Sequence, residues 1–150
     1  MFGSVPTGLP PLTKTYRLHS KAATAGFTWE DDEEVERQVE AEWLELLDAK
    51  ASGDEDAKVH ELGDMILSLV ELGRRMGIKA AHATDLAANR FRSRFEAMEA
   101  LAKEQGKDFA SLDLDGMDEL WNEVKANEKP SASATDHHAP FVNPAESHDN

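Results

Sequence analysis

Two pairs of acidic residues have a spacing that suits metal chemistry. Glu42 and Glu45 lie three residues apart, as do Glu61 and Asp64. Residues three apart share one face of a helix, so each pair would present two carboxylates side by side. Oxygen ligands alone suit a hard divalent cation such as Mg²⁺, which commonly completes its shell with water and substrate phosphates. Ordinary solvated helix acids show the same spacing, and such pairs arise easily among 30 acidic residues.

The segments around these acids predict two helices joined by a short polar connector at 52–56. The first helix is expected over 30–51 and the second from the connector to residue 76, each with one apolar stripe. A connector this short favours an antiparallel hairpin, in which the four carboxylates could converge. The stripes consist of Val35, Val39, Trp43, Leu46 and Leu47 in the first helix and Leu62, Met65, Ile66, Leu69 and Leu72 in the second.

The acids also lie close to the expected core. Glu42 is in line with Val39 and Leu46, and Glu61 is in line with Met65. Carboxylates beside a core repel one another, and each unpaired ion costs on the order of several kcal/mol to desolvate. A bound cation would relieve both costs.

The rest of the chain predicts an all-α fold, because alternating strand-like runs are absent. Thr28 is expected to cap the first long helix, with Asp31 completing a variant of the capping box, and Gly53 to end it. Further helices are expected over 12–25, 79–103 and 115–127. In domain terms, we expect an extended N-terminal arm over 1–11, a helical domain over 12–128 and a disordered tail over 129–150, which includes the His137–His138 pair.

Composition narrows the class of protein. The chain has 16 basic and 30 acidic residues, a net charge of −14, which disfavours nucleic acid as a partner. A nucleotide carried with a divalent metal is still compatible, because the metal reverses the local charge. The absence of cysteine excludes disulfides and thiol chemistry. The longest apolar run, 65–70, is too short to span a bilayer, and no signal peptide is evident, so we expect a soluble cytoplasmic protein without a membrane partner.

The order of the motifs resembles one enzyme family. Glu42-x-x-Glu45 followed by Glu61-Leu-Gly-Asp64 resembles the E-E-x-x-E … E-x-x-D signature of the MazG nucleoside triphosphate pyrophosphohydrolases. The similarity covers about 9–128 in the family's order. LPPLTKTYRLHSKAATAGFTW is similar to the segment that enters the family's C-terminal MazG domain, and ELGDMILSLVELGRRMGI is similar to the second metal-binding helix of that domain. RFRSRF resembles the family segment that follows, and DLDGMDELWNEVKANE resembles its closing helix.

This resemblance implies a fold and an activity. Helical hairpins from different subunits would assemble into a bundle, as a homodimer or a larger homo-oligomer. The implied reaction is Mg²⁺-dependent hydrolysis of ribo- or deoxyribonucleoside triphosphates between the α- and β-phosphates, with Mn²⁺ as an alternative ion. The products would be nucleoside monophosphate and pyrophosphate, in a role of nucleotide-pool clean-up. Full-length members carry two such domains, so the chain is expected to be a stand-alone domain of the C-terminal type.

The resemblance also implies roles for single residues. Glu42, Glu45, Glu61 and Asp64 match the metal ligands, which are the catalytic positions. The resemblance also implies three substrate contacts. Arg90 stands where the family usually has a phosphate-contacting lysine, Arg94 matches the family's arginine, and Trp121 matches an aromatic residue near the base. Lys58 is near enough to the site to touch phosphate. The alternatives are solvated helix arginines paired with nearby acids, and a core tryptophan.

Four positions depart from the family pattern: Gln38, Ala41, His60 and Ala88 stand where lysine, glutamate, glutamate and asparagine are common. These changes put the rate and the substrate range in doubt, because groups around the ligands tune both. His60 is either an additional base or a surface histidine. Two further hypotheses stay open: a catalytically weak oligomer that binds nucleotide or a partner protein, and a purely structural bundle.

Overall fold

The computed structural model describes residues 1–128, and within that range all the regular secondary structure is helical, as the sequence predicts. The disordered tail predicted for 129–150 lies outside the described residues. The elements are α1 (Pro11–Thr24), α2 (Asp32–Ser52), α3 (Glu55–Arg75), α4 (Ala80–Glu104), a short 3-10 helix η1 (Phe109–Ser111) and α5 (Leu114–Asn127). The described residues divide into two compact units, with the boundary between Leu86 and Ala87. None of the helices over 1–128 is both long enough and apolar enough to cross a membrane.

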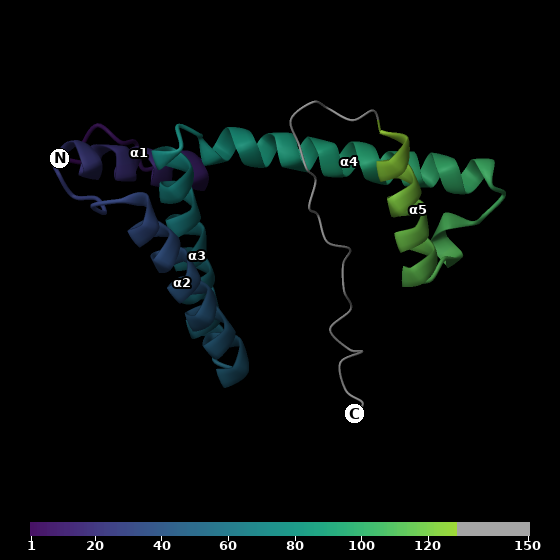
Figure 1. Ribbon diagram of the computed structural model, residues 1–150, viewed down its shortest axis with the longest axis horizontal. Coiled ribbons are helices and arrows are strands. Elements are labelled where there is room, and N and C mark those ends of the chain that lie inside the picture. Colours follow the sequence, from purple (N-terminus) through teal and green to yellow (C-terminus); the bar gives the residue numbers. More distant parts are fainter. Residues whose placement is uncertain (129–150) are drawn as a thin grey trace. The chain divides into compact units, whose positions relative to one another are not determined.

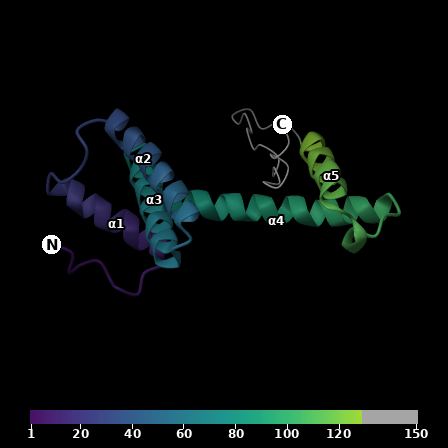
Figure 2. The same cartoon turned by 90° about the horizontal axis from the view of Figure 1, so that it is seen from below.

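The hairpin of α2 and α3 dominates the first unit. The two helices lie side by side and antiparallel in both views (Figures 1 and 2). Gly53 ends α2 with a φ of 74°, a left-handed conformation that favours glycine, so the predicted stop is confirmed. Asp54 then caps α3, because its carboxylate accepts from the backbone N–H groups of Asp56 and Ala57. The connector is therefore only two residues long.

The predicted cap of α2 is wrong. Asp31, not Thr28, is the N-cap, and its carboxylate accepts from the backbone N–H of Glu34 at 2.8 Å. The Thr28 hydroxyl instead donates to Glu71 and accepts from Arg75, each at 3.1 Å. These partners lie on α3, so a tertiary contact takes the hydroxyl that local sequence assigned to the helix start.

The hairpin interface is more polar than the apolar stripes predict. On α3, residues 61, 64, 68, 71 and 75 recur on one face, and this face meets α2: Arg75, for example, donates to Asp32 at 2.7 Å. Ser68 and Glu71 on this face are only 2% and 1% exposed. The predicted stripes are correspondingly wrong in part, because several of their large side chains are exposed: Trp43, Leu47, Leu62, Ile66 and Leu69.

A buried charged network joins α1 to α3. Glu71 accepts two hydrogen bonds from Arg74, both at 2.8 Å, and lies 3.4 Å from Nδ1 of His19 on α1. Burial pushes the pKa of Glu71 upward, but the hydrogen bonds from Arg74 and Thr28, with the charges of Arg74 and His19, outweigh it and hold that pKa below its usual range. Glu71 is therefore ionised and fully partnered inside the fold.

We expect His19 to make the docking of α1 sensitive to pH. Burial lowers the pKa of His19, Arg74 lowers it further, and Glu71 opposes both. A histidine with a lowered pKa contributes stability that is present above its unfolded pKa of about 6.5 and lost as pH falls below it. We therefore expect the wild type to lose stability relative to His19→Gln between pH 7.5 and 5.5. Urea unfolding at both pH values checks this, with the exposed His82→Gln as the control; parallel losses in wild type and H19Q would contradict it.

A core cluster of buried apolar residues lies in the second unit. Met98 and Ala102 from α4 pack against Leu120 and Val124 from α5. Asp113 caps α5, since its carboxylate accepts from the backbone N–H of Gly116 at 2.9 Å. The core therefore holds α5 against the second half of α4.

Candidate metal centre

The hairpin brings the four predicted carboxylates together. Glu42 and Glu45 lie on α2, and Glu61 and Asp64 lie on the first half of α3. One carboxylate oxygen each from Glu42, Glu45 and Glu61 lie within 4.8 Å of one another. Asp64 is close enough for its charge to act on Glu42. The antiparallel pairing produces this convergence, because the second half of α2 faces the first half of α3.

Glu42 is the buried member of this group, only 8% exposed. Its Oε1 accepts from the Gln38 amide, whereas its Oε2 is buried without a hydrogen-bond partner, as is Oε2 of Glu61. Burial raises the pKa of Glu42, the charges of Glu45 and Asp64 raise it further, and the Gln38 hydrogen bond opposes them. A cation would satisfy both unpartnered oxygens and offset the repulsion between the carboxylates. An ion that prefers oxygen ligands, such as Mg²⁺ or Mn²⁺, therefore fits these residues.

Gln38 has a role that sequence reasoning missed. In the sequence, position 38 stood out only because the family commonly has lysine there. In the structure, the side-chain amide of Gln38 donates a hydrogen bond to one oxygen of Glu42. The available signal was the i, i+4 spacing, which places an amide beside a carboxylate on one helix face. Gln38 therefore orients Glu42.

Two further residues near this end of α3 have their own partners. Lys58 contacts Glu55 at 2.6 Å, an ion pair in the first turn of the helix, rather than one of the four carboxylates. His60 lies with Nε2 3.1 Å from Oδ2 of Asp64. The structure therefore places His60 at the edge of the acidic group and pairs Lys58 within its own helix.

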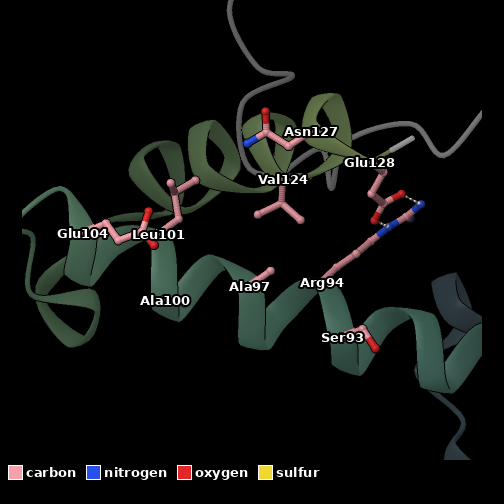
Figure 3. Close-up of a pocket in the computed structure, with 9 residues that line it drawn as sticks. All are labelled: Ser93, Arg94, Ala97, Ala100, Leu101, Glu104, Val124, Asn127 and Glu128. Atoms are coloured by element: carbon pink, nitrogen blue, oxygen red, sulfur yellow. Dashed lines mark hydrogen bonds and ion pairs between the residues drawn. The ribbon is translucent and has the colours of Figure 1, made fainter. Parts of the chain in front are cut away.

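The other predicted contact residues, Arg90, Arg94 and Trp121, belong to the second unit. Arg90 is exposed on α4. Arg94 is only 6% exposed; it donates to both oxygens of Glu128, at 2.7 and 2.9 Å, at the edge of a pocket between α4 and α5 (Figure 3). Its guanidinium also lies 5.6 Å from the ring centroid of Trp121. Arg94 is thus a buried, stacked arginine rather than a solvated one.

Trp121 is partly buried and belongs to an aromatic cluster. Its ring centroid lies 5.7 Å from that of Phe91, and Phe91 lies 6.3 Å from Phe95. Phe95 in turn meets Phe109 edge to face at 5.3 Å. Trp121 therefore packs beside the core cluster and also presents a ring face to Arg94.

Comparison with known proteins agrees with this geometry. No protein-family model matches the chain. It is 31% identical over 127 residues to the nucleoside triphosphate pyrophosphohydrolase/pyrophosphatase MazG of Thermotoga maritima, which is 85% of this chain and 49% of that protein. It is also 31% identical over 126 residues to the nucleoside triphosphate pyrophosphohydrolase of Escherichia coli K12, covering 83% and 48%.

A third relative matches a shorter stretch. The uncharacterized protein YabN of Bacillus subtilis is 39% identical over 71 residues, which is 47% of this chain and 14% of YabN. The chain spans about half the length of the two pyrophosphohydrolases. The order of the motifs, the converging carboxylates and these identities together make the chain a homologue of the nucleoside triphosphate pyrophosphohydrolases of the MazG family.

Proposed function

We propose that the protein hydrolyses ribo- or deoxyribonucleoside triphosphates between the α- and β-phosphates in a Mg²⁺-dependent reaction, as part of nucleotide-pool clean-up. The observation that carries the proposal is the group of Glu42, Glu45 and Glu61, with Asp64 beside it, in which two buried oxygens have no hydrogen-bond partner. A family of triphosphate hydrolases supplies the reaction type.

In this proposal the four acids are the ligands, and Gln38 orients Glu42. An ion held there would neutralise charge on the triphosphate and lower the pKa of the attacking water. The reaction would consume one water: its oxygen forms a bond to the α-phosphorus, its protons pass to the products and the solvent, and the bond from that phosphorus to the α,β-bridging oxygen breaks. Pyrophosphate leaves with the electron pair of that bond.

The proposal assigns the arginines to the phosphates and Trp121 to the base. Arg94 already binds the planar carboxylate of Glu128 through two hydrogen bonds, and phosphate oxygens satisfy the same fork geometry. Arg90 lies one helical turn away and would add a second charge. Lys58 is a further proposed phosphate contact, for which the ion pair with Glu55 would have to open.

A product assay tests the proposal. The protein is incubated with a panel of ribo- and deoxyribonucleoside triphosphates, with Mg²⁺, with Mn²⁺ and with EDTA, and the products are separated. Metal-dependent monophosphate plus pyrophosphate is the expected result. Diphosphate plus orthophosphate would contradict the assigned bond. Metal-dependent nucleotide binding without turnover would favour the weak binding oligomer, for which reversion of Ala41 and His60 to glutamate is the next step.

We also propose that the chain works as a homodimer or larger homo-oligomer. The buried residues of α2 and α3 are polar or small apolar ones, whereas large apolar side chains form an exposed stripe on each helix. Trp43 and Leu47 on α2 are 49% and 39% exposed, and Leu62 and Ile66 on α3 are 50% and 41% exposed. Large apolar side chains that recur at helical spacing on a surface mark an interaction site, and a second copy offers the same stripes in return.

Charges placed in these stripes are expected to dissociate the oligomer. Leu47→Asp and Ile66→Asp would each bury a carboxylate in the proposed interface, which is costly without a partner. Size-exclusion chromatography with light scattering is expected to give a multiple of 16.6 kDa for the wild type and 16.6 kDa for the double variant. Arg37→Asp, which adds a carboxylate to α2 outside the stripe, is the control. A wild-type monomer would contradict the proposal.

A further inference from the structure

His60 stands out among the residues around the carboxylates because it is not an acid. Its imidazole, Glu61 and Asp64 each offer one ligand atom, and these three atoms lie within 4.8 Å of one another. The imidazole Nε2 is 3.1 Å from Oδ2 of Asp64, one helical turn further along α3. Three donors from two adjacent turns of one helix thus converge.

This group adjoins the carboxylate group and shares Glu61 with it. Glu61 has a buried oxygen without a hydrogen-bond partner, so the shared residue retains an acceptor oxygen that a cation can satisfy. Glu42, 8% exposed, adds the second such oxygen in the neighbouring group. Acidic spacing alone therefore does not support the second group, because an imidazole and the unpartnered buried oxygen of Glu61 accompany it.

The donor sets of the two groups differ in chemistry. Glu42, Glu45 and Glu61 offer only oxygen, which suits Mg²⁺, whereas the second group adds a nitrogen. Imidazole suits transition-metal ions such as Zn²⁺, Fe²⁺ and Ni²⁺, whereas Mg²⁺ prefers oxygen and sheds water reluctantly. Mn²⁺ prefers oxygen too but, unlike Mg²⁺, also accepts an imidazole nitrogen. A histidine at this position therefore changes which ions the centre accepts.

We propose that His60, Glu61 and Asp64 form a second divalent-cation position, adjoining the carboxylate position, which takes ions that bind imidazole in preference to Mg²⁺. The inference rests on the proposed function only in taking Glu61 and Asp64 as metal ligands. His60 is 69% and Asp64 41% exposed, so an ion reaches this position from solvent without opening the hairpin. An ordinary surface His–Asp pair would show the same 3.1 Å contact but would hold no ion.

Mn²⁺ bound to the full-length chain without nucleotide tests this assignment. Pulsed electron paramagnetic resonance detects coupling between Mn²⁺ and a directly bound imidazole nitrogen. The three histidines outside the described residues, His137, His138 and His148, are replaced by glutamine in every sample so that they contribute no signal. We expect nitrogen coupling in this background, its loss in His60→Gln and its retention in the control His82→Gln.

Two further measurements sharpen the test. Calorimetric titration is expected to show the ratio of Mn²⁺ to Mg²⁺ affinity falling about tenfold or more in His60→Gln, because loss of one ligand costs at least as much as loss of a supporting group. Glu42→Gln is expected to keep the nitrogen coupling, since Glu42 is not part of the second group. Loss of coupling in Glu42→Gln would overturn the separate position.

The outcomes separate this inference from the proposed function. Mn²⁺ bound through oxygen alone, or nitrogen coupling that persists in His60→Gln, overturns the inference while pyrophosphate release with Mg²⁺ still supports the activity. Nitrogen coupling in a chain that hydrolyses no nucleotide supports the inference and overturns the activity. A chain that binds no Mn²⁺ overturns the second position, whatever the activity assay shows.

Discussion

Replacement of Glu42 by glutamine is expected to abolish Mg²⁺-dependent triphosphate hydrolysis while it stabilises the metal-free chain. Glu42 is buried beside Glu45 and Asp64, and the structure leaves one of its oxygens without a partner. Loss of a ligand removes transition-state stabilisation of about several kcal/mol, which corresponds to a fall in kcat/KM of at least about 10²-fold. Initial rates over a range of triphosphate concentrations, at saturating Mg²⁺, measure the loss of kcat/KM.

The higher stability expected of metal-free Glu42→Gln follows from the raised pKa of Glu42. A carboxyl whose pKa is raised by folding contributes stability that is present below its unfolded pKa of about 4.3 and lost as pH rises through its folded pKa. At pH 7 the ionised side chain therefore costs stability, and glutamine removes the charge. Thermal unfolding in EDTA is expected to give a higher Tm for Glu42→Gln than for the wild type.

Addition of Mg²⁺ should then reverse the order of the two melting temperatures, so that the wild type has the higher Tm. An ion that binds only the folded state stabilises it by about 2.7 kcal/mol at one hundred times its Kd, so the Tm of the wild type rises with Mg²⁺ and that of Glu42→Gln does not. Glu40→Gln, an exposed acid on the same helix, is the control and should behave as the wild type. Wild-type turnover in Glu42→Gln would contradict the role of Glu42 as a metal ligand. A higher Tm for Glu42→Gln, with no effect of Mg²⁺ on the Tm of either protein, would favour the purely structural bundle.

Replacement of Glu71 by alanine is expected to cost about 3–5 kcal/mol of stability in the first unit, the usual loss when one partner of a buried ion pair is removed. Glu71 is 1% exposed, and the change would leave Arg74 and Thr28 without their partner. Urea unfolding followed by tryptophan fluorescence and circular dichroism measures the change. Trp29 is a suitable reporter, because its carbonyl accepts from Arg75 beside the network.

The dependence of this loss on pH identifies its cause. Because the pKa of Glu71 is lowered, its contribution is present above its unfolded pKa of about 4.3 and lost as pH falls through the lower folded pKa. The difference between wild type and Glu71→Ala should therefore shrink below pH 4.3. Arg37→Ala, which breaks an exposed pair with Glu33, is the control and should change stability by less than about 0.5 kcal/mol. A loss for Glu71→Ala that is equally small would contradict a structural role for the network.

Much of the carboxylate group was predictable from local sequence. The spacing of Glu42 and Glu45, and of Glu61 and Asp64, follows from helical periodicity, and the short connector with Gly53 dictates an antiparallel return. Those two constraints suffice to bring the two pairs together. The Arg94–Glu128 pair was not predictable in this way, because it joins Arg94 on α4 to a residue 34 positions further along the chain, directly after the end of α5.

The sequence by itself thus determined the helical class, the ends of the helices to within a few residues, and the acids that converge, because helical periodicity and the glycine stop act locally. Only the tertiary structure decided what covers each face. Thr28 could have capped α2 but bonds to Glu71 instead, and Trp43 and Leu47 could have been core but lie exposed. The reason is that burial depends on which face meets a neighbouring helix. In this hairpin the buried positions hold polar or small apolar residues, and several large apolar side chains lie on the outside.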